Sequence, residues 1–159
     1  MTLYLVRHAH ALSRGDWRGS DEDRPLSSRG HAQAGALSEW MAGRYVDRVL
    51  SSRAVRCQQT VAPVAARYGL RVDLAAPLFE GASGRQALEL VHREAGADAV
   101  LCSHGDVIPA LIDALSGAGC SVVGGRSPAK GALYVIDVAD GRPVRATYVG
   151  LPAGTTSGR

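Results

Sequence analysis

The sequence predicts an α/β fold, a three-layer α/β/α sandwich around a mostly parallel sheet with an antiparallel hairpin at one edge. Two observations support this fold class. Short apolar runs, typical of strands buried on both faces, alternate with longer segments in which apolar residues recur at helical spacing. Near the end of the chain, two strand-like runs flank Asp140 and Gly141, a pair typical of a tight hairpin turn. Alternating strands and helices favour parallel strands covered by helices on both faces.

The first strand is expected at residues 3–8, where an apolar run stops at Arg7 and His8. Residues 11–23 are rich in Ser, Gly, Asp and Arg and show no periodicity, so they predict a loop directly beyond that strand. Loops in such a position usually shape a binding site.

Four helices and five further strands are expected after this loop. The helices are expected at residues 28–44, 53–68, 85–94 and 107–115, and the strands at 46–51, 70–74, 98–103, 132–138 and 144–149. Ser27 or Ser28 is the expected N-cap of the first helix, and Gly69 is expected to end the second. Pro63 is expected to kink the second helix or to end its first half. Residues 117–130 predict a Gly- and Ser-rich loop.

Length and composition indicate an ordinary globular protein. A chain of 159 residues suits one domain, expected over residues 1–152 and followed by a frayed tail at 153–159. The hydrophobic fraction is 46% and no apolar run approaches the ~20 residues that span a bilayer, so no membrane partner is expected. Three cysteines without metal-ligand spacing predict reduced thiols, and a strand where a signal peptide would lie predicts a cytoplasmic protein.

The charge of the chain does not indicate a nucleic-acid partner. The formal net charge is +3, but the basic residues are scattered and form no run. Arginine accounts for 17 of the 18 basic residues, and Lys130 is the single lysine. Some of these arginines are expected to surround a phosphorylated substrate, because the guanidinium fork matches phosphate oxygens.

Residues with reactive side chains stand where three predicted strands end. Arg7 and His8 follow the first strand, residues 53–56 follow the second, His104 follows the fourth, and Glu80 lies in a loop between the last two. The carboxyl ends of parallel strands share one edge of a sheet, so these groups can converge. Phosphoryl transfer through a phosphohistidine uses this set: an imidazole that attacks phosphorus, arginines and a second imidazole that neutralise the oxygens, and a carboxylic acid that protonates the leaving group.

The order and spacing of three motifs resemble the histidine phosphatase superfamily, also called phosphoglycerate mutase-like. The motifs are residues 5–9 (LVRHA), residues 51–60 (SSRAVRCQQT) and residues 103–105 (SHG), and the resemblance extends from residue 3 to about residue 150. Residues 23–27 and 107–109, among others, look like the phosphatase half of actinobacterial proteins whose other half is a MutT-like Nudix hydrolase. The small SixA-like protein phosphohistidine phosphatases are similar in size.

The resemblance implies a role for each matching residue. His8 matches the nucleophile, Arg7 and Arg56 match the arginines that clamp the phosphate, His104 matches the second histidine, and Glu80 matches the proton donor. Seven further residues are candidate substrate contacts: His10, Ser13, Arg14, Arg53, Ser103, Gly105 and Lys130. Arg53 is a rim candidate only, because many relatives carry proline or an apolar residue there. The role of His10 is open.

The resemblance implies a metal-independent phosphomonoester hydrolase without a cofactor. Its substrate is expected to be a small phosphorylated metabolite such as a nucleotide, and inorganic phosphate is an expected ligand. Two alternatives stay open, a SixA-like phosphatase that acts on phosphohistidine in proteins and a non-catalytic sensor of phosphorylated ligands on the same fold. A deep pocket roofed by residues 11–24 favours a metabolite, and a small shallow site favours a phosphoprotein. His31 and His92 are expected at the surface, and Asp106 is expected to be a helix N-cap.

Overall fold

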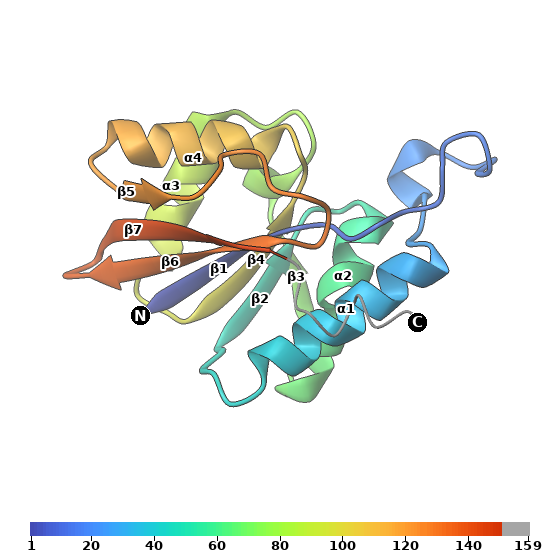
Figure 1. Cartoon of the computed structure of the whole chain (residues 1–159), viewed down its shortest axis with the longest axis horizontal. Helices are drawn as coiled ribbons and strands as arrows, with labels where there is room; N and C mark the ends of the chain where they lie inside the picture. Colours follow the sequence, from blue (N-terminus) through green and yellow to red (C-terminus); the bar gives the residue numbers. More distant parts are fainter. Residues whose placement is uncertain (151–159) are drawn as a thin grey trace.

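The computed structural model describes residues 1–150 and confirms the α/β sandwich (Figure 1). A seven-stranded sheet runs in the order β3-β2-β4-β1-β6-β7-β5. Strands β3, β2, β4 and β1 are parallel to one another, and β6 runs antiparallel to its two neighbours, β1 and β7. The strands are β1 (Thr2–Arg7), β2 (Arg48–Ser51), β3 (Val72–Leu74), β4 (Ala99–Ser103), β5 (Ser121–Val123), β6 (Leu133–Ala139) and β7 (Arg142–Val149).

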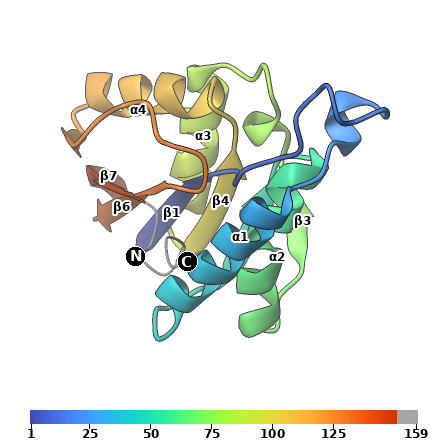
Figure 2. The ribbon, with the colours of Figure 1, turned by 45° about the vertical axis from the view of Figure 1, so that its right-hand side comes forward.

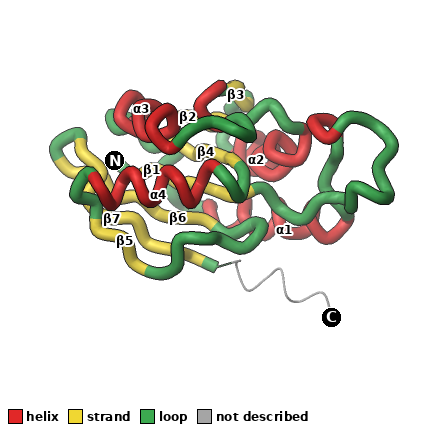
Figure 3. Tube along the Cα trace, turned by 90° about the horizontal axis from the view of Figure 1, so that it is seen from above, coloured by secondary structure: helices red, strands yellow, loops and turns green. Residues whose placement is uncertain are grey.

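Helices cover both faces of the sheet, as Figure 1 and the view from above in Figure 3 show. The helices are α1 (Ser28–Met41), α2 (Val55–Arg67), α3 (Gly84–Glu94) and α4 (Val107–Gly117), with short 3-10 turns at η1 (Asp21–Asp23) and η2 (Ala76–Leu78). Along β1, Leu3 and Leu5 pack with α3 and α4, whereas Tyr4 and Val6 pack with α1 and α2. This alternation is the period-2 geometry of a strand, and it makes β1 the centre of both cores.

The helix boundaries follow local chemistry. The Ser27 side chain accepts a hydrogen bond from the Gly30 amide and caps α1, as expected. The first helix ends at Met41 rather than near residue 44, because Gly43 adopts a positive φ of 81°. The second helix continues through Pro63 to Arg67, so the prediction that Pro63 could end its first half is wrong.

The Gly-rich segment before the hairpin is not all loop. Residues 121–123 form β5, which pairs in parallel with β7 beyond the hairpin and occupies the edge of the sheet. Three residues of weak alternation give little periodicity, which explains why the strand is hard to see in the sequence. The expected fraying of residues 153–159 lies outside the described residues.

The topology brings three strand ends to one edge of the sheet. Arg7 pairs with Ser103 across β1 and β4, and Ser51 pairs with Cys102 across β2 and β4. Residues 8–27 leave this edge as a long loop that extends beyond the sheet next to α1 and α2 (Figure 2). Within residues 1–150, none of the helices is long and apolar enough to span a bilayer.

Candidate active site

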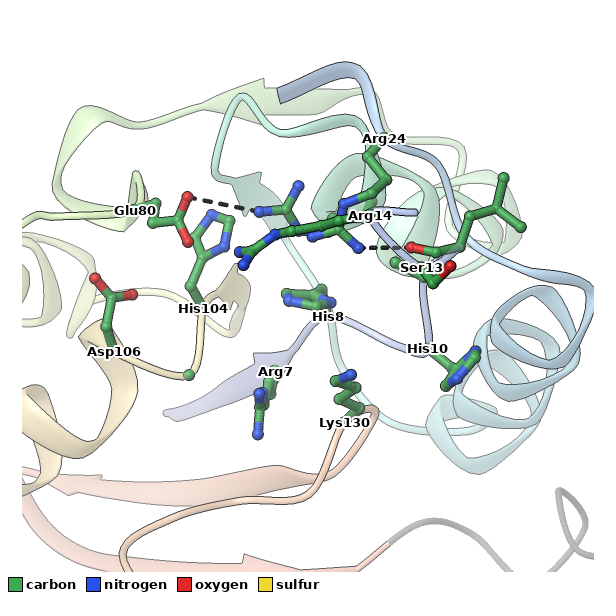
Figure 4. A pocket seen from close by; sticks show the side chains of 14 residues that line it. Arg7, His8, His10, Ser13, Arg14, Arg24, Glu80, His104, Asp106 and Lys130 are labelled. Atoms are coloured by element: carbon green, nitrogen blue, oxygen red, sulfur yellow. Dashed lines mark hydrogen bonds and ion pairs between the residues drawn. The ribbon is translucent and has the colours of Figure 1, made fainter. Parts of the chain in front are cut away.

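A pocket of about 620 Å³ opens where these strands end (Figure 4). Its floor comes from the ends of β1 and β4, and residues of the long loop after β1 form part of its wall. The lining residues are Arg7, His8, His10, Ala11, Leu12, Ser13, Arg14, Arg24, Arg56, Glu80, His104, Gly105, Asp106 and Lys130. The residues predicted as nucleophile, phosphate clamp, second histidine and proton donor therefore share one cavity.

His8 is held as a neutral imidazole at the centre of this pocket. Its side chain is 7% exposed, and its Nδ1 lies 2.8 Å from the Ala9 carbonyl oxygen. A carbonyl can only accept, so Nδ1 carries the hydrogen and Nε2 keeps its lone pair. Burial lowers the pKa of His8 to about 3; the hydrogen bond to Ala9 opposes this shift, and the positive charge of Arg56 adds to it. His8 is thus a neutral imidazole with an available Nε2 lone pair at physiological pH.

Arg7 is the last residue of β1, and its side chain is fixed by the segment before β6. Its Nη1 donates to the Pro128 carbonyl oxygen at 2.8 Å. Gly105 leaves the space that this guanidinium occupies, since a Cβ on Gly105 would lie 2.7 Å from Arg7 Nη2. Burial lowers the pKa of Arg7, but a guanidinium stays protonated in proteins.

Arg56 lies in the first turn of α2 and is 2% exposed. Its Nη1 donates to the Asp21 carbonyl oxygen at 2.7 Å, and its Nη2 lies 3.2 Å from Asp21 Oδ2. Burial raises the pKa of Asp21, but the hydrogen bond from Arg24 and the charge of Arg56 outweigh it and lower the pKa below its usual value. The loop after β1 is therefore fastened to the buried arginine by a carboxylate that stays ionised.

His104 follows β4 and is 2% exposed, with its ring centroid 5.5 Å from that of His8. Its Nε2 lies 2.8 Å from the Ser52 hydroxyl and 3.6 Å from Cys57 Sγ. These two contacts hold the ring between β2, α2 and β4 and leave Nδ1 without a partner.

Three residues that line this pocket each carry a buried nitrogen atom without a hydrogen-bond partner. Within residues 1–150, four buried side-chain polar atoms are unpartnered, and three of them are Arg7 Nε, Arg56 Nε and His104 Nδ1. All three residues line the cavity that contains His8. Unpaired buried polar groups are costly and rare, so three in one pocket indicate a place built for an acceptor-rich anion.

Glu80 lies on the opposite side of His104 from His8 in Figure 4, in the loop after η2. Its Oε1 is 3.6 Å from Arg56 Nη2, and about half of its side chain is exposed. Residues 78–81, named here the Glu80 loop, are fastened to the end of β4 and the residues after it at two points. Ser103 Oγ donates to the Leu78 carbonyl oxygen at 2.7 Å, and Asp106 Oδ2 accepts from the Gly81 amide at 2.9 Å.

The candidate substrate contacts divide into three groups. His10, Ser13, Arg14, Gly105 and Lys130 line the main pocket. Arg53 lines a neighbouring cavity instead, where it pairs with Glu22 at 3.0 Å and lies over the Phe79 ring. Ser103 is fully buried and lines neither cavity, because its hydroxyl donates a hydrogen bond to Leu78 of the Glu80 loop.

Sequence reasoning did not identify several residues that shape the site. Asp21 and Arg24 come from a loop without periodicity, and their charge is the only feature of the sequence that points to a role in the site. Asp106 occupies the N-cap position of α4 as expected, but its side chain makes no capping hydrogen bond and binds the Glu80 loop instead. Within the described residues there is no cluster of three or more His, Cys, Asp or Glu side chains able to hold a metal ion.

The fold and this pocket define an α/β protein with a cationic cavity at the strand ends and a histidine at its centre. The family model of the histidine phosphatase superfamily (branch 1) matches residues 3–87, and the chain belongs to that family. Over 161 aligned residues it is 31% identical to the 8-oxo-(d)GTP phosphatase of Mycolicibacterium smegmatis, an alignment that covers 95% of this chain and 48% of the relative. The chain thus spans about half the length of the curated relatives it matches.

Solved structures show the same fold. The protein histidine phosphatase SixA complexed with tungstate superposes with a TM-score of 0.75 at 19% identity and covers 99% of both chains. A mycobacterial glucosyl-3-phosphoglycerate phosphatase in complex with inorganic phosphate superposes with a TM-score of 0.72 at 18% identity, covering 97% of this chain and 98% of the other. At these identities the likeness establishes the fold alone.

Proposed function

We propose that this protein is a phosphomonoester hydrolase that works through a phosphohistidine at His8, with cations supplied by its own side chains. The observation that carries the proposal is the set of unpartnered buried nitrogens on Arg7, Arg56 and His104 around a neutral His8. A phosphoryl group has three peripheral oxygens, and each can accept from one of these residues.

In the first step, His8 Nε2 attacks phosphorus in line with the leaving oxygen. The Nε2–P bond forms as the bond from phosphorus to the leaving oxygen breaks, and Glu80 in its protonated form gives its proton to that oxygen. The negative charge that spreads over the peripheral oxygens meets Arg7, Arg56 and His104. The Ala9 carbonyl stabilises the positive charge that develops on the imidazole, because it accepts from Nδ1 at 2.8 Å.

In the second step, water attacks the phosphohistidine. Glu80, now a carboxylate, accepts a proton from the water, the Nε2–P bond breaks, and His8 returns to its neutral form. Phosphate leaves, and Glu80 again carries the proton needed for the next cycle.

The shape of the pocket favours a small phosphorylated metabolite over a phosphoprotein. The cavity has a volume of about 620 Å³, within the usual range of ligand pockets, and residues 11–14 and Arg24 of the long loop line it. We further propose a cytoplasmic location, which the three unpaired cysteines support.

The test is phosphate release from p-nitrophenyl phosphate by the wild type and by His8→Ala. We expect the rate of His8→Ala to fall by at least about a thousandfold, because no other side chain replaces the nucleophile. His92→Ala is the matched control, since His92 is exposed on α3 and lies outside the main pocket. Wild-type enzyme quenched during turnover of labelled substrate should carry acid-labile, alkali-stable phosphate that His8→Ala lacks.

Two results would contradict the proposal. Turnover by folded His8→Ala at the wild-type rate would remove the phosphohistidine step. A wild type that binds phosphate but releases none from any phosphomonoester would instead identify a sensor. Circular dichroism of both variants separates loss of chemistry from loss of fold.

A further inference from the structure

The single lysine of the chain stands next to the proposed nucleophile. Lys130 lines the main pocket, and Figure 4 places it between Arg7 and His10, beside His8. All other basic residues of the chain are arginines. Within residues 1–150, the Lys130 ammonium makes no hydrogen bond or ion pair, whereas Arg14, Arg24 and Arg56 all pair with Asp21.

The turn that carries Lys130 is fixed to β1 on both sides of the lysine. The Gly131 amide lies 3.1 Å from the carbonyl oxygens of both Arg7 and His8, and the Arg7 amide donates to the Ala132 carbonyl at 3.0 Å. Before the lysine, Pro128 accepts from Arg7 Nη1 at 2.8 Å. The backbone at Lys130 is therefore held against the nucleophile, and only the side chain is free to move.

His10 provides a second polar group on the same side of His8. Its Nδ1 lies 2.6 Å from the Ser27 hydroxyl, and its amide donates to Gln33 Oε1 at 2.8 Å, so the residue is tied to the start of α1. The contact with Ser27 engages Nδ1, and within residues 1–150 the other ring nitrogen, Nε2, makes no hydrogen bond. His10 and Lys130 line the same pocket, and burial together with the charges of Arg29 and Lys130 lowers the pKa of His10.

The scissile phosphoryl group does not need these two residues. Its three peripheral oxygens already have buried donors on Arg7, Arg56 and His104, and Glu80 serves the leaving oxygen on the other side of His8 (Figure 4). A backbone-fixed but unpaired ammonium beside an imidazole with a free ring nitrogen suits another anion.

We propose that Lys130 and His10 form a subsite for a second anionic group of the substrate, a carboxylate or a second phosphoryl group close to the one that is transferred. This inference rests on the proposed function, because it assigns the substrate class of the same pocket. Because the Gly131 amide contacts the His8 carbonyl oxygen and Lys130 shares the pocket with His8, both anionic groups would belong to one small substrate.

The experiment measures binding by titration calorimetry with three non-hydrolysable probes of one size class. Methylphosphonate carries one anionic group, phosphonoacetate adds a carboxylate, and methylenediphosphonate adds a second phosphoryl group. The proteins are the wild type, Lys130→Gln, the charge-preserving Lys130→Arg, and Arg18→Gln, which removes one exposed charge outside the pocket. Because binding needs no turnover, a failed hydrolysis assay leaves this readout intact.

We expect at least one two-anion probe to bind the wild type about tenfold or more tightly than methylphosphonate, and the preferred probe identifies carboxylate or phosphoryl. Lys130→Gln should reduce this preference to about twofold or less, whereas Lys130→Arg and Arg18→Gln should keep most of it. Two results overturn the subsite: a wild type that binds all three probes equally, or a Lys130→Gln variant that weakens all three by the same factor. The second result would assign Lys130 to the scissile phosphoryl group.

Discussion

Acidification is expected to destabilise the folded chain through His8. The pKa of His8 is about 3 in the folded chain, against an ordinary value of 6.5. The unfolded chain therefore takes up a proton at His8 as the pH falls below about 6.5, whereas the folded chain does so only near pH 3. The contribution of neutral His8 to the free energy of unfolding is complete above pH 6.5, and it is lost progressively as the pH falls from about 6.5 to about 3. Between about pH 7 and pH 5 the loss amounts to about 2 kcal/mol, from the linkage relation for one site.

Urea unfolding of the wild type and His8→Gln at these two pH values isolates this contribution. Glutamine does not titrate, so the wild type should lose about 2 kcal/mol more free energy of unfolding than the variant. Other titrating groups affect both proteins alike and cancel in the difference. The buffers contain no phosphate, because a ligand that binds only the folded chain would stabilise it. Equal losses in the two proteins would refute a neutral, buried His8.

Three further predictions concern the residues around His8. Glu80→Gln should slow hydrolysis of alkyl phosphates by about a hundredfold but affect p-nitrophenyl phosphate much less, because a good leaving group needs little protonation; equal slowing would remove Glu80 as the acid. Asp106→Ala should produce part of the same leaving-group dependence, because it releases the Gly81 amide. Asp106→Asn keeps an acceptor for that amide and should restore the wild-type rates. Identical kinetics of those two Asp106 variants would contradict a positioning role. Gly105→Ala should weaken inorganic phosphate binding about tenfold, because the new Cβ would lie 2.7 Å from Arg7 Nη2 and displace the guanidinium. Unchanged affinity in a folded variant would count against this packing.

Much of this architecture is predictable because it rests on patterns that are local in sequence. Buried strands give continuous apolar runs, and the polar residues that end them mark the functional edge of the sheet. His8 and His104 were identifiable for this reason, since each follows an apolar strand directly. The cap at Ser27 and the turn at Gly69, whose φ is 66°, likewise follow from single residues.

What the sequence does not reveal depends on tertiary contacts. Ser103 and Asp106 both follow the motif pattern at the end of β4, but their side chains turn to the Glu80 loop, 25 residues away in sequence. No local pattern distinguishes a serine that faces a pocket from one that binds a distant carbonyl. The continuation of α2 through Pro63 is a similar case, because helix packing overrides the local propensity of proline.

Arg56 connects the irregular loop to the chemistry of the pocket. Its Nη1 and Nη2 reach Asp21, so two of its nitrogens already hold the loop, while Nε has no partner. A phosphoryl group that binds Nε therefore meets a guanidinium whose orientation Asp21 has fixed beforehand, and orientation before binding reduces the entropy lost on binding. The same carboxylate pairs with Arg14 and Arg24, which both line the pocket. Asp21 thus aligns the buried Arg56 and the outer wall of the pocket together, and under the proposed function we expect phosphate affinity to depend on this loop as well as on the strand ends.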